Sequence, residues 1–407
     1  MSRLEELIQE LCPNGVKFLP ISEIGTLTRG KRFVHADAVD EGVPCIHYGE
    51  IYTYYGLSTV ATKSFVREEI APKLRYAHKN DVIIVGAGEN NIDIGIGVAY
   101  LGDDEVAIHD ACYILTHEMN PKYISYCLRT NDYHKQIKKY VSSGKICSIS
   151  TKGIGRAVIP VPPLEVQREI VRILDHFTEL TTELATELAA RKKQYEYYRD
   201  QLLNRDMGFQ MIELGDVCTF IRGPFGGALK KEIFEPEGFA VYEQQNAIYQ
   251  NLSIRYHISS QKFDELKRFA VHSGDLIVSC SGTIGKTFVI PECAPQGVIN
   301  QALLKLTPCN ELNVYYLQFF FENTISKILN GVARGGAIKN VPAVKELKKI
   351  KIPLPPLEEQ QRIVDILDRF DTLCNDLTAG LPAEIEARQK QYEYYRDKLL
   401  TFEPLAD

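Results

Sequence analysis

The chain has 407 residues, 45% of them hydrophobic, and a formal charge of −6 from 47 basic and 53 acidic side chains. Such a length fits two to four domains with well-packed cores. Ten cysteines without a Cys-x-x-Cys pair argue against a disulfide framework or a zinc site, and no apolar run approaches the roughly 20 residues of a membrane span. Because the N-terminus also lacks the apolar core of a signal peptide, we expect a cytoplasmic protein.

The charge is distributed unevenly along the chain. Residues 164–190 carry six acids and two bases, and residues 357–386 carry eight acids and two bases. By contrast, residues 129–156 and 327–351 each hold seven lysines and arginines against a single acid. The acidic average therefore conceals two basic blocks of the kind that a nucleic-acid-binding protein needs.

The first part of the chain predicts a mixed α/β domain. Residues 2–11 predict a short helix, because their leucines and one isoleucine share a face and Pro13 follows. Short strands such as 81–85 come next, separated by glycines and turn residues, and a helix is expected over 121–140.

A long helix is predicted to begin within the stretch PVPPLEVQREIVRILD at residues 160–175. Its prolines hold the chain extended, and nothing breaks a helix from Leu164 to about Leu203. About 40 residues at ~1.5 Å each make a rod of roughly 60 Å. Apolar residues recur mostly every three or four positions, so we expect one face to pack on a partner helix.

The whole pattern is duplicated. The proline-led stretch returns as PLPPLEEQQRIVDILD at 353–368, an offset of 193 residues (353 − 160), and each copy runs into the same seven residues, QYEYYRD, at 194–200 and 391–397. A period near half the chain indicates one duplicated unit. The stretches 34–79 and 226–272 show no readable match, which is natural if each copy reads something different.

The second copy predicts a helix over 357–400 with its own apolar stripe. Two stripes in one chain favour pairing, and a pseudo-twofold arrangement with antiparallel helices would leave one globular unit at each end. Gly380-Leu381-Pro382 lies in a four-residue insertion and is expected to kink or interrupt this helix. The residues expected to pack between the helices are Ile170, Leu174, Phe177, Leu184, Leu188, Ile363, Leu367, Phe370, Leu377 and Tyr392.

Three tetrapeptides of the form Thr-Glu-Leu-x follow one another at 178–189. Their plain interpretation is a helix-forming segment with a leucine stripe. A sharper hypothesis is a length adjuster, since one tetrapeptide adds ~6 Å and just over one turn of helix without disturbing the packed face.

Motifs that would indicate catalysis are incomplete. The stretch GTIGKT at 282–287 resembles a phosphate-binding loop, but Cys280 stands where the leading glycine belongs, so a β-turn is expected. The triplet Glu346-Leu347-Lys348 lacks a further carboxylate nearby, and the histidines form no ligand pair. We therefore expect no catalytic residue and no metal site in this chain.

The basic blocks and two Arg-Gly loops are the candidates for contacts with DNA phosphates or bases. A solvated helix face is the alternative for either block, but two equal blocks at matching places favour DNA. The candidate residues are Arg29, Lys31, Arg32, Lys138, Lys139, Lys145, Lys152, Arg222, Lys286, Arg334, Lys339 and Lys345.

Together these features resemble the specificity (S) subunit of type I restriction-modification enzymes. The proline-led helix start, its repetition after a second variable domain, the Tyr-Glu-Tyr-Tyr-Arg-Asp ending and the Thr-Glu-Leu-x tetrapeptides are the resembling motifs, and they span essentially the whole chain. The resemblance implies two α/β target recognition domains, at 1–163 and 205–356, separated by two long antiparallel helices at 164–204 and 357–402. Each domain would read one half of a bipartite, asymmetric DNA target.

The resemblance also implies partners and cofactors. Two modification subunits would bring S-adenosylmethionine and methylate adenine, and restriction subunits would join them with ATP and Mg, so no cofactor is expected on this chain. Double-stranded DNA would be its binding partner, in the cytoplasm at the nucleoid. Two alternatives stay open: a self-contained DNA methyltransferase or nuclease, and a coiled-coil interaction protein without a DNA role.

Overall fold

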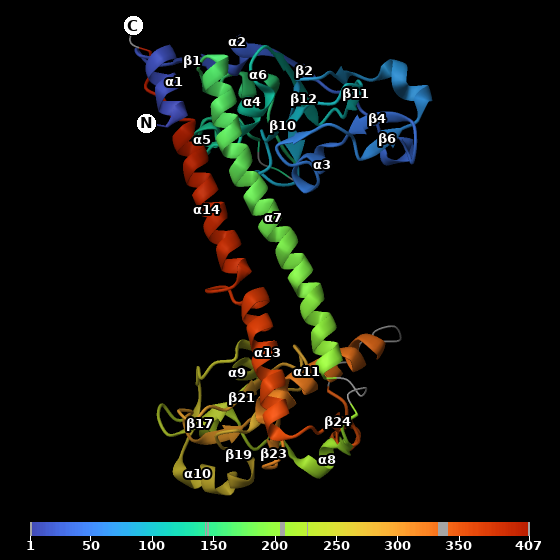
Figure 1. Cartoon of the computed structure of the whole chain (residues 1–407), viewed down its shortest axis with the longest axis vertical. Coiled ribbons are helices and arrows are strands. Elements are labelled where there is room, and N and C mark those ends of the chain that lie inside the picture. The colour runs from blue at the N-terminus through green and yellow to red at the C-terminus, as the bar shows by residue number, and fades with distance from the viewer. Residues whose placement is uncertain are drawn as a thin grey trace. The chain divides into compact units, whose positions relative to one another are not determined.

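The computed structural model describes residues 2–142, 144, 146–203, 208–225, 227–332 and 341–405. The chain forms two compact parts, residues 1–185 with 384–407 and residues 186–383, called unit 1 and unit 2 here (Figure 1). Both contain strands and helices, so the predicted mixed α/β class is confirmed. The predicted boundaries at 163, 204, 356 and 402 stay a prediction, because this division into units runs through the long helices instead.

Unit 1 is built on two five-stranded sheets with the strand orders β2-β12-β8-β10-β5 and β3-β6-β4-β11-β7. Each sheet mixes antiparallel pairs with one parallel pair, β10 with β5 and β11 with β4. The predicted strand at 81–85 is β8, which is buried along its whole length and forms the middle of the first sheet. The strands are β2 (Gly25–Arg29), β3 (Ala38–Val39), β4 (Val43–Ile46), β5 (Ser58–Thr59), β6 (Ser64–Val66), β7 (Tyr76–Ala77), β8 (Val82–Val85), β10 (Gly97–Tyr100), β11 (Val106–Ile108) and β12 (Cys112–His117).

Two short strand pairs complete the strands of unit 1. β1 (Lys17–Pro20) pairs with β14 (Val158–Val161), so the start of the unit is joined to the segment that leads into the long helix. β9 (Ala87–Gly88) pairs with β13 (Cys147–Ser148).

Most of the short helices of unit 1 begin at a side chain that caps them, α2 (Ile21–Ile24) being an exception. α1 (Arg3–Leu11) confirms the predicted N-terminal helix, and Ser2 caps it by accepting from the Glu5 N–H at 3.3 Å while the Glu5 carboxylate accepts from the Ser2 N–H at 2.7 Å. The other helices are α2 (Ile21–Ile24), α3 (Tyr48–Thr53), α4 (Pro121–Cys127), α5 (Asn131–Lys138) and α6 (Thr151–Gly155).

The single helix predicted over 121–140 is wrong, because the chain forms two helices, α4 and α5, there. Thr130 separates them: its hydroxyl donates to the Cys127 carbonyl at 2.8 Å and accepts from the Tyr133 N–H at 3.3 Å. One side chain thus closes α4 and caps α5.

Unit 2 repeats this plan with two four-stranded sheets, β16-β23-β20-β21 and β18-β17-β22-β19, of which β17 and β22 are parallel. Its strands are β15 (Met211–Glu213), β16 (Cys218–Arg222), β17 (Phe239–Tyr242), β18 (His257–Ile258), β19 (Ala270–Val271), β20 (Leu276–Ser279), β21 (Thr287–Val289), β22 (Gly297–Ile299), β23 (Leu303–Pro308) and β24 (Lys351–Pro353), and β15 pairs with β24. Its short helices are α8 (Leu214–Val217), α9 (Gln244–Tyr249), α10 (Ser260–Glu265) and α12 (Val344–Leu347). The region that matches α4 and α5 is one helix here, α11 (Val314–Val332).

The predicted long helices are present, and the second one is interrupted as expected. α7 runs from Leu164 to Leu202, whereas the second copy consists of α13 (Leu357–Asn375) and α14 (Leu381–Leu399). Gly380 lies in the break, where a Cβ would come within 2.3 Å of the Thr372 carbonyl oxygen, so only glycine fits. Within the described part of the chain, no helix combines the length and apolar character needed to cross a membrane.

A buried glutamine attaches each long helix to its globular part. Gln167 is 2% exposed; its side-chain oxygen accepts from the Asn120 N–H at 2.9 Å and its amide donates to the Pro162 carbonyl at 2.7 Å. Gln360, 193 residues later, accepts from the Asn313 N–H at 2.8 Å and donates to the Pro355 carbonyl at 2.8 Å. The duplicated motif therefore makes the same anchor in both units.

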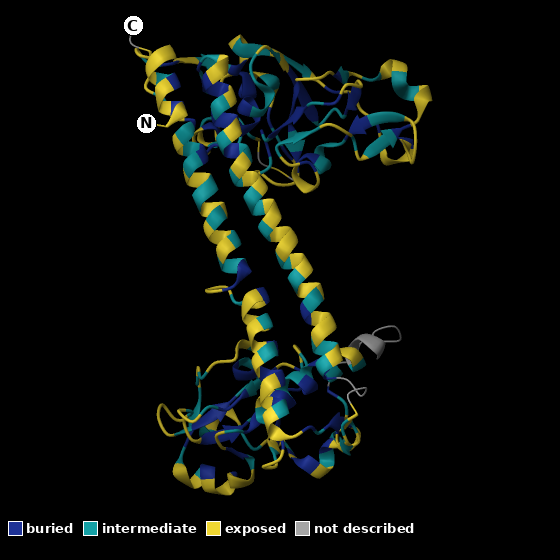
Figure 2. Cartoon of the chain, viewed as in Figure 1, coloured by how far each residue is buried: buried dark blue, intermediate teal, exposed yellow. Residues whose placement is uncertain are grey.

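Within each unit, α7 packs against part of the second copy. In unit 1 the rings of Phe177 and Tyr395 stack with centroids 5.4 Å apart. In unit 2, Phe370 stacks on Tyr195 and Tyr198 at 6.2 and 5.9 Å. Figure 2 shows the solvent-exposed faces that these helices retain.

The residues predicted to pack between the helices are buried to different degrees. Ile170, Leu174, Ile363 and Leu367 are buried, and Phe177, Leu184, Leu188, Phe370 and Tyr392 are half-buried. Leu377 is a correction: it is 74% exposed, because the turn between α13 and α14 takes it off the helical stripe.

Candidate nucleic-acid interface

The two Arg-Gly loops lie at matching places, directly after β2 in unit 1 and after β16 in unit 2. Their glycines are required by a close approach of two backbones. A Cβ on Gly30 would lie 2.2 Å from the His109 carbonyl oxygen, and one on Gly223 would lie 1.8 Å from that of Asn300. The glycine of each pair is therefore structural, and the loop is pressed against a second loop.

The arginines of these loops are partly engaged within the protein. Arg29 donates from Nε to the Asp110 carbonyl at 2.7 Å and lies 3.6 Å from the Asp110 carboxylate. Lys31 and Arg32 are exposed and form no ion pair with any residue that the structure describes. Arg222 is exposed next to Cys280, whose pKa is raised to about 11 by burial and held down in part by this arginine. In the Arg-Gly loop of unit 1, the cationic side chains without an ion-pair partner among the described residues are thus the two that follow the glycine, Lys31 and Arg32.

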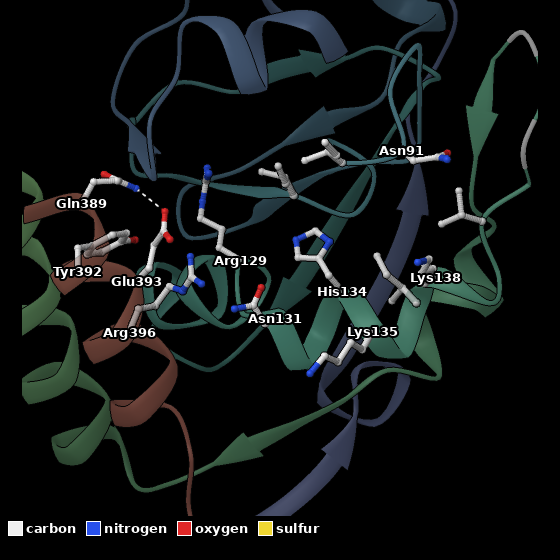
Figure 3. A pocket seen from close by; sticks show the side chains of 14 residues that line it. Asn91, Arg129, Asn131, His134, Lys135, Lys138, Gln389, Tyr392, Glu393 and Arg396 are labelled. Carbon is white, nitrogen blue, oxygen red and sulfur yellow. Dashed lines mark hydrogen bonds between the residues drawn. The ribbon is translucent and has the colours of Figure 1, made fainter. Parts of the chain in front are cut away.

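The first basic block divides between the surface and a cavity of about 830 Å³ in unit 1 (Figure 3). Lys138 lines this cavity, together with His134 of α5 and Arg396 of α14. Lys139 is exposed, with its ammonium group 5.1 Å from the ring centroid of Tyr140. Lys152 is exposed on α6.

Arg129, counted in the first basic block, has a structural role instead. Its guanidinium donates to the carbonyls of Gly56 at 2.7 Å and Gly97 at 3.3 Å. Burial lowers the pKa of Arg129. Burial also lowers the pKa of the neighbouring His134, and Arg396 and Arg129 lower it further. One end of the Arg129 guanidinium is therefore committed to backbone carbonyls of unit 1.

In unit 2 the structure locates only some of the candidates. Lys286 is exposed in the connection between β20 and β21, where residues 282–285 form bends and turns, as predicted, and Gly282 and Gly285 have φ values of 66° and 78°. Lys345 is exposed on α12. The predicted candidates Lys145, Arg334 and Lys339 lie outside the described residues.

A ring cluster that sequence reasoning missed lies beside the Arg-Gly loop of unit 1. His47 and His109 follow the parallel neighbours β4 and β11, and their ring centroids are 4.4 Å apart. Tyr48 is 4.5 Å from the His47 ring, and Phe33 is 4.9 Å from the His109 ring. The Lys31 N–H donates to the Ile108 carbonyl at 2.9 Å, so the loop with the free cations lies on the same strand end.

The two imidazoles of this cluster are neutral hydrogen-bonding groups. Burial lowers the pKa of both His47 and His109. Nδ1 of His47 accepts from the Gly49 N–H at 3.4 Å, and Nδ1 of His109 accepts from the Ala111 N–H at 3.1 Å. The remaining proton of each ring is therefore on Nε2.

Unit 2 has carboxylate and amide groups at the corresponding strand ends. Glu243 follows β17 and is paired with Arg255 at 2.9 Å. Gln244 accepts from the Ser281 hydroxyl at 3.2 Å. Asn300 follows β22 and accepts from the Ala302 N–H at 3.0 Å, and Gln301 beside it is exposed.

Both strand-end clusters can donate and accept hydrogen bonds next to exposed cations, which is the chemistry of a surface that reads DNA. Among the described residues there is no group of three or more histidines, cysteines, aspartates or glutamates that could hold a metal ion. No signal in the sequence pointed to these clusters, since their members lie about 60 residues apart and a parallel strand pair brings them together.

Comparisons with known proteins all point to one protein family. A family model described as "Type I restriction modification DNA specificity domain" matches residues 13–191 and 207–387. A putative type I restriction enzyme specificity subunit of Haemophilus influenzae is 42% identical over 260 residues, which are 60% of this chain and 63% of that protein. A type I restriction enzyme specificity subunit of Escherichia coli is 37% identical over 253 residues, 60% of this chain and 61% of that protein. The matches thus span about three-fifths of the length of these relatives.

The fold also has solved counterparts. One solved structure matches with a TM-score of 0.64 and 19% identity. It is described as the structural basis underlying complex assembly and conformational transition of the type I R-M system. The match covers 95% of this chain and 98% of the other. At that identity the likeness concerns the fold alone.

Proposed function

The chain belongs to the family of type I restriction modification DNA specificity domains, and from this premise we propose that it is the DNA-reading subunit of a type I restriction-modification enzyme. Each unit reads one half of a bipartite target. The observation that supports this most directly is the pair of strand-end clusters, which stand on the same framework in both units but present rings and neutral imidazoles in unit 1 and amides in unit 2. Two different surfaces on one framework suit two different half-sites.

The chemistry is assigned to partner subunits. Two modification subunits bind S-adenosylmethionine and methylate adenine, and restriction subunits use ATP and Mg; this chain itself has no catalytic residue and acts in the cytoplasm. Support comes from the family and from the exposed acidic side chains Glu179 and Glu183 on α7, which offer a surface for basic partners. Those partners are needed for any test of activity.

Phosphate contacts by Lys31 and Arg32 can be tested through salt dependence. Binding of the assembled complex to its target should weaken as salt rises, because phosphate neutralisation releases counterions. In the double variant Lys31→Gln and Arg32→Gln, we expect weaker binding to target and unrelated DNA alike, and a slope of log affinity against log salt reduced by about 1 to 2.

The control for this experiment is Lys267→Gln with Arg268→Gln, which removes the same charge from two exposed residues after α10. Complexes of this control should bind as the wild type does. An unchanged salt slope in the Lys31 and Arg32 variant would show that the Arg-Gly loop of unit 1 does not contact phosphates. If the wild-type complex bound DNA with an affinity that did not depend on salt, the DNA-reading function itself would be contradicted.

A further inference from the structure

The strand-end loops of the two units share one framework. In unit 1 the His109 N–H donates to the Ile46 carbonyl at 3.2 Å. In unit 2 the Asn300 N–H donates to the Tyr242 carbonyl at 2.9 Å. Each of these two residues also accepts, through its own side chain, from the N–H two positions later, at 3.1 Å and 3.0 Å. His109 and Asn300 thus form the same two hydrogen bonds in their units, one through the backbone N–H and one through the side chain.

The neighbouring turn is matched in the same way. Glu50 accepts from the His47 N–H at 3.1 Å at the start of α3, and Asn246 accepts from the Glu243 N–H at 2.8 Å at the start of α9. Since the close approach of Gly30 and Gly223 to these loops also repeats, the loops at 47–50 and 109–111 correspond to those at 243–246 and 300–302.

With the backbone matched, the side chains at the corresponding positions can be compared, although Asp110 lies 3.6 Å from Arg29 and Gln244 accepts from the Ser281 hydroxyl. Tyr48 of unit 1 corresponds to Gln244 of unit 2, and Asp110 corresponds to Gln301. Gln301 is exposed, and its amide makes no side-chain hydrogen bond within the described part of the chain. These positions therefore differ in hydrogen-bonding chemistry while the backbone hydrogen bonds around them correspond.

We propose, building on the proposed DNA-reading function, that these matched positions determine which bases each half-site contains. Tyr48 and Asp110 select the half-site of unit 1, and Gln244 and Gln301 select that of unit 2. A glutamine amide pairs with the N6 and N7 edge of adenine in the major groove, so an adenine is the base that Gln301 reads. An aspartate accepts from the N4 amino group of cytosine, and it cannot donate to the N7 of adenine.

The location of these residues supports base contacts. In unit 1 the free cations Lys31 and Arg32 lie on a loop that is hydrogen-bonded to the end of β11, one residue before His109. Phosphate contacts orient a protein on the duplex, and the sequence is read by side chains that reach the base edges, so polar side chains beside phosphate-binding cations are candidates for that role. In unit 2, Gly223 brings the Arg222 loop to the same place against Asn300.

The test uses the full chain assembled with its modification subunits. For each variant, the methylated adenines are mapped in the genomic DNA of cells that produce that variant complex. Gln301→Ala should relax one base position of one half-site, with discrimination at that position lowered by roughly 5- to 150-fold. Asp110→Ala should relax a position in the other half-site. The untouched half-site and the spacer should stay as in the wild type, and each variant is therefore the control for the other.

The outcomes separate this inference from the function on which it rests. If the wild-type complex yields no bipartite motif, the proposed function fails before any variant is made. If both variants methylate the wild-type motif with unchanged preference at every position, the function stands and the inference is overturned. If a variant complex methylates nothing, its affinities for target DNA and for unrelated DNA are measured instead. A lower ratio of target to unrelated affinity, with unchanged affinity for unrelated DNA, supports the inference. An unchanged ratio overturns it.

Discussion

Two buried glutamines attach the long helices to the globular parts, and Gln360 makes the larger set of bonds. It is 0% exposed, accepts from the Asn313 N–H and donates to the carbonyls of Glu311 and Pro355 at 2.8 Å each. An apolar replacement would leave these buried backbone groups without a partner. The glutamine of the duplicated motif is therefore a structural residue.

Gln360→Leu should destabilise unit 2 by about 2 to 5 kcal/mol, because each buried polar group left without a partner costs roughly 1 to 3 kcal/mol. Urea unfolding followed by circular dichroism measures the loss. The neighbouring Gln361→Leu is the control, since Gln361 is exposed and its replacement should change stability by only about 0.5 kcal/mol. Equal losses in the two variants would contradict the anchor.

Glu322 is a half-buried residue of unit 2 whose charge state should affect stability. Burial raises the pKa of its carboxyl, although the N–H and hydroxyl of Thr287 donate to it at 3.2 and 2.5 Å and lower the pKa in part. The folded state therefore holds this proton more tightly than the unfolded state does. The protonated Glu322 carboxyl therefore contributes stability below the usual glutamate pKa of about 4.3. This contribution is lost as the pH rises through the raised pKa of the folded state.

We accordingly expect Glu322→Gln to gain stability relative to the wild type as the pH is raised from about 4 to neutral. A glutamine can still accept from Thr287 and has no charge to bury. Melting temperatures of wild type and variant across this range measure the difference, with the exposed Glu311→Gln as a control. A constant difference at all pH values would show that the carboxyl does not titrate as described.

At the scale of elements, the pairing of the long helices rests on aromatic contacts at defined positions. Phe370→Ala removes the ring that stacks on Tyr195 and Tyr198. Because Phe370 is half-buried, we expect a loss of about 1 to 3 kcal/mol, below the 3 to 5 kcal/mol of a fully buried phenylalanine. Leu377→Ala, on the same predicted stripe but 74% exposed, should cost only about 0.5 kcal/mol.

Thermal or urea unfolding distinguishes these two variants directly. If Leu377→Ala were as destabilising as Phe370→Ala, the break between α13 and α14 would not be present in solution. Phe177→Ala provides the corresponding test in unit 1, where its ring stacks on Tyr395.

The two matched helical regions show what the spacing of apolar residues predicts and what it does not. Residues 121–140 have the apolar spacing of a single helix, yet Thr130 divides them into α4 and α5 through a hydroxyl that bonds on both sides. The matching α11 continues without a break. Spacing predicts which residues are helical, but a capping contact depends on one side-chain conformation that spacing does not contain.

At the scale of the whole molecule, the tetrapeptide repeat predicts a link between the length of α7 and the DNA target. Deleting residues 182–185 removes ~6 Å of helix. Since one base pair occupies ~3.4 Å, we expect the same two half-sites with a spacer shorter by one or two base pairs. Mapping methylated adenines in cells that contain the deletion measures the spacer.

Replacing residues 182–185 by four alanines is the control for that deletion, because it keeps the helix length and changes only the side chains. Its spacer should equal that of the wild type. A spacer that is unchanged in the deletion, or altered in the alanine variant, would contradict the length adjuster.

The sequence by itself determined the duplication, the long helices and their interruption at Gly380, because prolines, glycines and apolar spacing act on the local chain. It also located the exposed cations of the Arg-Gly loop. Only the tertiary structure decided that Arg129 is used internally, that Leu377 leaves the stripe and that His47 lies against His109. The physical reason is that these depend on parallel strand pairs and close backbone approaches between distant segments, which no local pattern records.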